Sequence, residues 1–212
     1  MIFDLDGVLI DTEPIWQAVE CRVFGAVGVP LTPQDCGQTI GLRTDEVVRY
    51  WFERHPWPGV STDEVLARIL DGMVEAIGTE GRAMPGALDA IELAQGMDLP
   101  LAVASSSLDR LINAALDRLG VAEAFAVTAS AEHEARGKPD PAVFLTAARQ
   151  LGVEPERCVV LEDSPFGVQS AKAAGMHCIA VPSPGHEQAI APIADVVLES
   201  LEELTPAHLG GR

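Results

Sequence analysis

Two hydrophobic patterns divide the chain. Between about residues 14 and 80, apolar residues recur at the three- and four-residue spacing of amphipathic helices, and no strand-like run interrupts them. The first helical face consists of Ile15, Val19, Val23 and Val27. A second helix is expected to begin at Thr44, and a third after Ser61, where Glu64 would complete a capping box. This part of the chain is therefore predicted to form a small helical lobe.

The rest of the chain alternates short apolar runs with helical segments. The runs are residues 1–3, 101–104, 125–127, 158–161, 178–181 and 196–198, and helical spacing returns between most of them. Continuously apolar strands that alternate with helices are typical of a parallel sheet covered on both faces. We predict an α/β protein whose Rossmann-like core consists of residues 1–13 and 84–212. The helical lobe, residues 14–83, is inserted after the first strand.

Composition and charge favour a globular protein and argue against several kinds of partner. Of the 212 residues 48% are hydrophobic, which favours a globular fold, and no apolar run reaches the roughly 18 residues that span a bilayer. No signal peptide is apparent, so we expect a cytoplasmic protein. A monomer is the default expectation for its oligomeric state. The net charge of −18 argues against nucleic acid or an anionic membrane as a partner. The four cysteines lack metal-ligand spacing and are expected to be free thiols.

Polar residues follow three of the predicted strands at the point where each strand ends. They are Asp4 and Asp6, then Ser105, and finally Glu162 with Asp163. Side chains two residues apart in a strand share a face, so both early aspartates can point into the same space. Ligands of open parallel sheets bind beyond the carboxyl ends of the strands. These groups are expected to meet in one crevice, within reach of Lys138 in a Gly-Lys-Pro-Asp-Pro loop.

Such a set of groups suits phosphoryl transfer through an aspartyl-phosphate. Asp4 would be the nucleophile, and Asp6 would protonate the leaving oxygen and then activate water. Mg²⁺ held by Asp4, Asp163 and the Asp6 carbonyl would offset the repulsion between two anions. Lys138 would neutralise further charge, and the Ser105 hydroxyl with nearby backbone N–H groups would bind the phosphoryl oxygens. A calcium loop is disfavoured because the glycine comes too early after the aspartates.

These motifs resemble those of the haloacid-dehalogenase-like hydrolase superfamily. Asp4-Leu-Asp6-Gly, Ser105, Lys138-Pro and Glu162-Asp163-Ser correspond to its four motifs and span nearly the whole chain. The resemblance implies that Glu162 binds the metal or orients its waters. It also implies that residues 14–83 are the α-helical cap of that family. The cap sequence further resembles bacterial 2-deoxyglucose-6-phosphate and hexitol-phosphate phosphatases.

The resemblance also points to substrate-binding residues besides Ser105 and Lys138. Ser106 follows the second strand, and Arg43 follows Gly41-Leu42 before a cap helix. Arg43 is interpreted as a substrate contact, with a structural helix-terminal arginine as the alternative. Glu13 and Trp16 lie beside the first hinge, and Trp16 suits the cap core equally well.

The function expected from these residues is Mg²⁺-dependent hydrolysis of small sugar or polyol phosphates, such as hexose or hexitol 6-phosphates. One alternative is a sugar phosphomutase of the β-phosphoglucomutase type, and another is a phosphoglycolate-type phosphatase. The mutases have a histidine ten residues after the acid–base aspartate, where this chain has Trp16. A carbon–halogen hydrolase would leave the acidic pair Glu162-Asp163 unexplained. A receiver-like phospho-acceptor module would not need so large a helical lobe.

Overall fold

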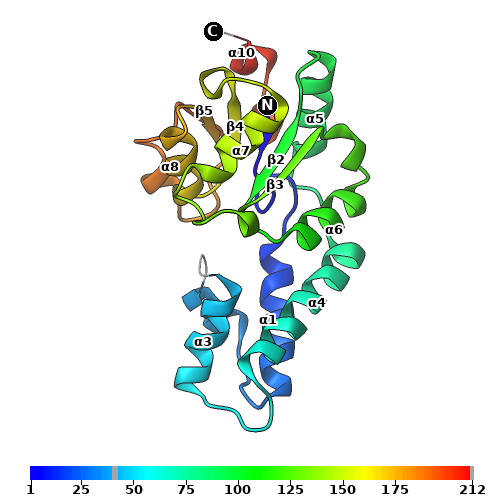
Figure 1. The fold of residues 1–212 in the computed structure, drawn as a ribbon, viewed down its shortest axis with the longest axis vertical. Helices are drawn as coiled ribbons and strands as arrows, with labels where there is room; N and C mark the ends of the chain where they lie inside the picture. The colour runs from blue at the N-terminus through cyan, green and yellow to red at the C-terminus, as the bar shows by residue number, and fades with distance from the viewer. Residues whose placement is uncertain (40–42, 211–212) are drawn as a thin grey trace. The chain divides into compact units, whose positions relative to one another are not determined.

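The computed structural model describes residues 1–39 and 43–210 (Figure 1). The chain divides into two compact units. The sheet unit comprises Met1–Asp11 and everything from Arg82 onward, and the helical unit is Thr12–Gly81. Gly41 and Leu42, which the sequence motif before Arg43 includes, lie outside the described residues.

The sheet unit contains a six-stranded parallel sheet in the order β3-β2-β1-β4-β5-β6. Its strands are β1 Ile2–Phe3, β2 Ala102–Ser105, β3 Val127–Ser130, β4 Val159–Glu162, β5 His177–Ala180 and β6 Val196–Val197. The predicted α/β fold with a parallel sheet is confirmed. The predicted bounds of the third strand are wrong, because Phe125 closes a 3₁₀ turn, Ala122–Ala124, and the strand begins only at Val127.

Helices cover both faces of this sheet (Figure 1). Helices α7 Ala142–Leu151 and α8 Pro165–Ala173 pack with α9 Glu187–Ile190 against one face, where alternate strand residues form a shared core. That face is made by Ile2, Ala102, Ala104, Ala129, Val160, Cys178 and Ala180. Figure 1 shows α5 Ala87–Gly96 and α6 Asp109–Leu119 on the opposite side, and the last helix is α10 Pro206–Leu209. Burial on both faces explains why the strands are apolar throughout.

The helical unit contains α1 Glu13–Ala26, α2 Pro33–Cys36, α3 Thr44–Arg54 and α4 Thr62–Glu80. Helix α1 packs along α4, and the ring of Phe24 contacts those of Trp51 and Trp57. The Ser61 hydroxyl accepts a hydrogen bond from the Glu64 N–H at 3.1 Å and so begins α4 where the sequence indicates. No strand occurs among the described residues of this unit. None of the helices that the structure describes is long and apolar enough to cross a membrane.

Candidate active site

The topology brings the early aspartates beside the acidic pair near residue 162. β1 lies between β2 and β4, so the carboxyl ends of these three strands are neighbours although they are far apart in sequence. Asp4 directly follows β1 and its N–H donates to the Leu161 carbonyl of β4 at 3.0 Å. The strand order reverses between β1 and β4, because the chain runs from β1 to β2 and β3 on one side and resumes at β4 on the other. Doubly wound folds bind ligands at such a reversal point.

Lys138 lies between two carboxylates. Its Nζ is 2.9 Å from Asp4 Oδ1 and 2.7 Å from Glu162 Oε1, and only 6% of its side chain is exposed. Burial by itself would lower the pKa of Lys138, but the charges of Asp4 and Glu162 outweigh it and raise that pKa. The lysine is therefore a fixed cation beside the Asp4 carboxylate.

Glu162 is completely buried, and both of its carboxylate oxygens have partners. Oε1 accepts from Lys138, and Oε2 accepts from the Asp163 and Ser164 N–H groups at 2.8 Å and from Ser164 Oγ at 3.0 Å. Gly167 in the first turn of α8 makes room for this carboxylate, because a Cβ there would overlap it. The fixed Glu162 carboxylate thus gives Lys138 a second anionic partner besides Asp4.

Asp163 is fixed by two segments of the sheet unit. Ser183, in the loop after β5, donates its hydroxyl to Asp163 Oδ2 at 2.5 Å and its N–H to the Asp163 carbonyl at 3.1 Å. On the other side, Gly7 turns with a φ of 74°, and a Cβ at that position would overlap the Asp163 carboxylate. The motif glycine is thus required both for the turn and for the approach of Asp163.

Serine side chains and backbone groups hydrogen-bond with two other predicted site residues, Asp6 and Ser105. Ser107 Oγ donates to Asp6 Oδ2 at 2.7 Å, and the Ser107 N–H donates to the Ser105 hydroxyl at 2.9 Å. Ser130 Oγ in turn donates to the Ser107 carbonyl at 2.7 Å. Ser105 is buried, whereas Ser106 is exposed. The sequence interpretation did not include Ser107 or Ser183, because a serine in a loop carries no spacing signal of its own.

The carboxylates are suited to a divalent cation. Asp4, Glu162 and Asp163 are all buried and offer oxygen atoms within 4.8 Å of one another. Asp4 Oδ1 accepts no aligned hydrogen bond among the described residues, although Lys138 Nζ is close to it. Burial, followed by the neighbouring carboxylates, raises the pKa of Asp4 despite the opposing charge of Lys138, and burial with the Glu162 charge raises the pKa of Asp163 to about 7. A hard cation would relieve this repulsion, so the residues fit Mg²⁺.

The remaining predicted residues belong to the helical unit. Arg43 is exposed, precedes α3 and forms an ion pair with Asp45 at 3.1 Å. Glu13 is exposed in the first turn of α1, and its Oε1 accepts from Gln17 at 2.9 Å. Trp16 is partly buried.

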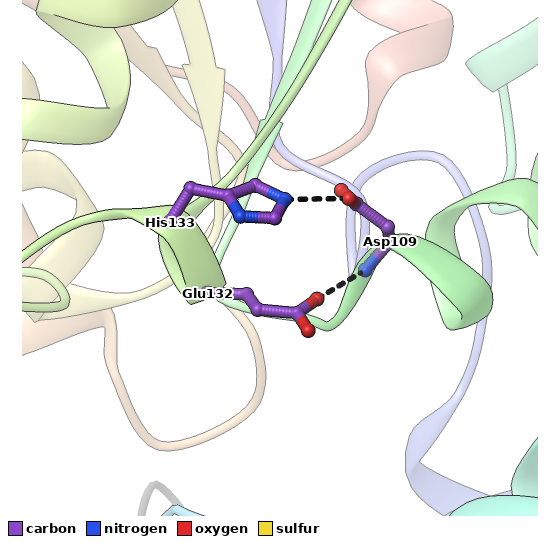
Figure 2. Close-up of side chains that lie close together, drawn as sticks. All are labelled: Asp109, Glu132 and His133. Carbon is purple, nitrogen blue, oxygen red and sulfur yellow. Dashed lines mark hydrogen bonds and ion pairs between the residues drawn. The ribbon is translucent and has the colours of Figure 1, made fainter.

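A second group of charged side chains lies in the sheet unit, and sequence spacing did not indicate it. Figure 2 shows the His133 ring directed at the Asp109 carboxylate, with Nε2 2.6 Å from Oδ2. Glu132 Oε2 accepts from the Asp109 N–H at 3.0 Å and so caps α6 (Figure 2). Asp109 and His133 also line a cavity of about 370 Å³. His133 is exposed and these contacts already satisfy the group, so we interpret it as a helix cap with a surface ion pair.

Comparison with known proteins identifies the family. The family described as "Haloacid dehalogenase-like hydrolase" matches residues 1–181. The chain belongs to this family. The hydrolase is 38% identical to hexitol phosphatase B of Escherichia coli (strain K12) over 212 residues, 99% of this chain and 96% of that protein. It is 32% identical to validoxylamine A 7'-phosphate phosphatase of Streptomyces hygroscopicus subsp. limoneus, over 99% of this chain and 97% of that protein.

Solved structures agree with this assignment. CbbY from Rhodobacter sphaeroides, crystallised as a variant in complex with xylulose-(1,5)bisphosphate, superposes with a TM-score of 0.87 at 28% identity, covering 99% of this chain and 98% of that one. A putative β-phosphoglucomutase from Thermotoga maritima has a TM-score of 0.82 at 30% identity, covering 98% and 95%. The predicted membership of the hydrolase family is confirmed, and its relatives include a hexitol phosphatase, one of the two kinds that the cap sequence suggested.

Proposed function

We propose that this hydrolase is a Mg²⁺-dependent phosphatase of small sugar or polyol phosphates that acts through an aspartyl-phosphate on Asp4. The observation that carries the proposal is the buried group of Asp4, Lys138, Glu162 and Asp163, where one Asp4 oxygen accepts no aligned hydrogen bond. The names of the curated relatives, hexitol phosphatase B among them, support the substrate class. The family and the site chemistry support the reaction.

The residues divide the chemistry among them. Asp4 attacks the phosphoryl group, and Lys138 holds a compensating charge 2.9 Å from the attacking carboxylate. The Ser105 hydroxyl and the backbone N–H of Ser106 bind phosphoryl oxygens. Asp6 gives a proton to the leaving oxygen and later takes one from the attacking water. Ser107 holds the Asp6 carboxyl in place.

Asp4, Asp163 and the backbone carbonyl of Asp6 would hold the Mg²⁺, with Glu162 as a further candidate ligand. The chemistry that the ion supplies when bound is neutralisation of charge between the phosphoryl group and the carboxylates. Glu162 already has a proton donor at each oxygen, so its effect is exerted at least in part through Lys138. The helical unit is proposed to serve as the cap, with Arg43, Glu13 and Trp16 selecting the substrate.

The test is release of inorganic phosphate from a panel of hexose, hexitol and pentose phosphates and phosphoglycolate, at fixed Mg²⁺ and in excess chelator. We expect hexose or hexitol 6-phosphates to have the highest kcat/KM and chelator to remove turnover. Preference for phosphoglycolate would assign the other phosphatase class. Full activity in chelator would refute the metal requirement.

A phosphomutase is the second candidate, because one similar solved structure is a putative β-phosphoglucomutase. A mutase must protect the aspartyl-phosphate from water until a sugar hydroxyl arrives. Trp16 stands where the resemblance to mutases would call for a histidine, which favours hydrolysis. A coupled assay for glucose 6-phosphate, with β-glucose 1-phosphate as the substrate, separates the two. Product formation faster than phosphate release would make the mutase assignment correct.

A further inference from the structure

A second reactive arrangement lies within the helical unit. Cys21 on α1 and Cys36 at the end of α2 place their sulfur atoms 3.8 Å apart. The buried carboxyl of Glu20 lies near the Cys36 thiol, and each group influences the pKa of the other. Glu20 and Cys36 are 7% and 4% exposed, whereas Cys21 is partly exposed. None of the three has a part in the proposed phosphoryl transfer.

We propose that Cys21 and Cys36 are an oxidation site that exchanges with low-molecular-weight disulfides to form a reversible intramolecular disulfide, with Glu20 as the proton acceptor. The two sulfur atoms are 3.8 Å apart, and a disulfide would bring them to roughly 2.05 Å. A small movement of the two side chains would therefore close the bond. The proposal does not depend on the hydrolase reaction.

Exposure decides the order of events. Cys21 is the thiol that solvent reaches, so it loses its proton to water and its thiolate attacks one sulfur of the small disulfide. The bond between the two small sulfurs breaks, and the first small thiolate leaves and takes up a proton from water. Cys36 then gives its proton to Glu20 and attacks the Cys21 sulfur of the mixed disulfide. A second small thiolate leaves and takes up the proton. Two protein thiols and one disulfide thus become one protein disulfide and two small thiols.

The burial of Glu20 suits it to accept the Cys36 proton. Burial raises the pKa of Glu20 to about 7, so that its ionised form is available near neutral pH and can still accept a proton. Burial, together with the nearby Glu20 charge, raises the pKa of the Cys36 thiol. Cys36 is therefore a poor first nucleophile and needs a base at its side to act second.

Closing this bond would tie α2 to α1. The cross-link would span 15 positions of the chain and remove conformational freedom from the unfolded state. The melting temperature of the oxidised protein should rise by about 5–10 °C. The 3₁₀ turn Gly37–Thr39, which directly follows Cys36, would then start from a covalently fixed point.

The test exposes the full chain to glutathione disulfide, quenches with iodoacetamide and maps every cysteine by mass spectrometry. We expect the wild type to lose two free thiols and to yield a Cys21–Cys36 cross-linked peptide, which a dithiol reductant reverses. Cys36→Ser should instead accumulate glutathione on Cys21, and Cys21→Ser should keep its remaining thiols. Cys158→Ser, at a buried cysteine of the sheet unit, is the control and should behave as the wild type.

Two results would overturn the proposal. One is a wild-type protein that keeps all four thiols, and the other is a wild type that stops at glutathione on Cys21. Glu20→Gln separates the role of the carboxyl from that of the sulfur pair. It should slow disulfide closure at least tenfold, within the range of lost general-base catalysis, while the mixed disulfide accumulates. Closure at the wild-type rate would show that Glu20 takes no part.

Discussion

Replacing Lys138 by methionine gives a direct test of how the proposed site is held together. The substitution keeps the side-chain length but removes the cation that lies 2.9 Å from Asp4 and 2.7 Å from Glu162. Both carboxylates are buried, so removing the lysine leaves their charges without a compensating partner. Breaking a buried ion pair by removing one partner costs about 3–5 kcal/mol. That loss is a large part of the roughly 5–15 kcal/mol by which domains are stable.

Urea unfolding followed by circular dichroism in the presence of chelator measures this loss. The chain provides a matched control, because Lys172 is the only other lysine and also forms an ion pair, with Asp195 at 2.6 Å. Its side chain is 36% exposed, so Lys172→Met should cost less than about 1 kcal/mol. The contrast between two lysines isolates the effect of burial.

Adding Glu162→Gln completes a double-mutant cycle. Alone, this change leaves Lys138 paired with Asp4. Combined with Lys138→Met, it removes one of the two carboxylate charges that the lost lysine leaves unpaired. The effects of the two changes on the free energy of unfolding should therefore couple by about 1–3 kcal/mol. If Lys138→Met lost no more stability than Lys172→Met, or if the cycle were additive, the lysine would not hold the carboxylates together as argued.

Three further predictions concern other parts of the chain. Asp4→Asn should remain folded, because Lys138 keeps its pair with Glu162, but should lower kcat by about 10³-fold or more, with no phosphate label retained on acid-quenched protein; substantial turnover would exclude Asp4 as the nucleophile. Ser183→Ala should weaken Mg²⁺ binding about tenfold in calorimetric titrations, because Asp163 loses its hydroxyl partner, while Ser183→Thr should bind like the wild type; equal affinities would contradict this. Burial raises the pKa of Glu20 from 4.5 to about 7, so the folded state binds the Glu20 proton more tightly than the unfolded state does. The resulting gain in the free energy of unfolding is complete below pH 4.5 and is lost as the pH rises through 7. At about 1.4 kcal/mol for each pH unit the change is about 3 kcal/mol, and Glu20→Gln should flatten it; an unchanged pH profile of urea unfolding would count against the burial of a proton at Glu20.

The sequence predicted the sheet because its strands obey one simple rule. A strand buried on both faces must be apolar at every position, so a polar residue marks the strand end. Asp4, Ser105 and Glu162 each stand at such an end, on three adjacent strands. The juxtaposition of these residues could therefore be inferred without knowing a single loop conformation.

Residues whose position depends on a loop conformation could not be inferred in this way. Ser183 lies 20 positions after Asp163 and reaches it because Glu162 stands opposite Ala180 in the β4–β5 register. Which side chain of the following loop then turns inward is decided by backbone angles that the residue types do not determine. Helix α2 was missed for a related reason, because Pro33–Cys36 is a single turn and shows no apolar periodicity. The burial of Glu20 and its contact with Cys36 were missed with it.

Charge links the metal to the substrate in the proposed reaction. The buried group contains three carboxylates, those of Asp4, Glu162 and Asp163, and one cation, Lys138. A phosphate monoester would add further negative charge to a group that already has a surplus, in a chain whose net charge is −18. Lys138 cannot serve all of these anions, because Glu162 already takes one of its hydrogen bonds. In the proposed reaction a divalent cation would therefore serve substrate binding as well as the chemical step.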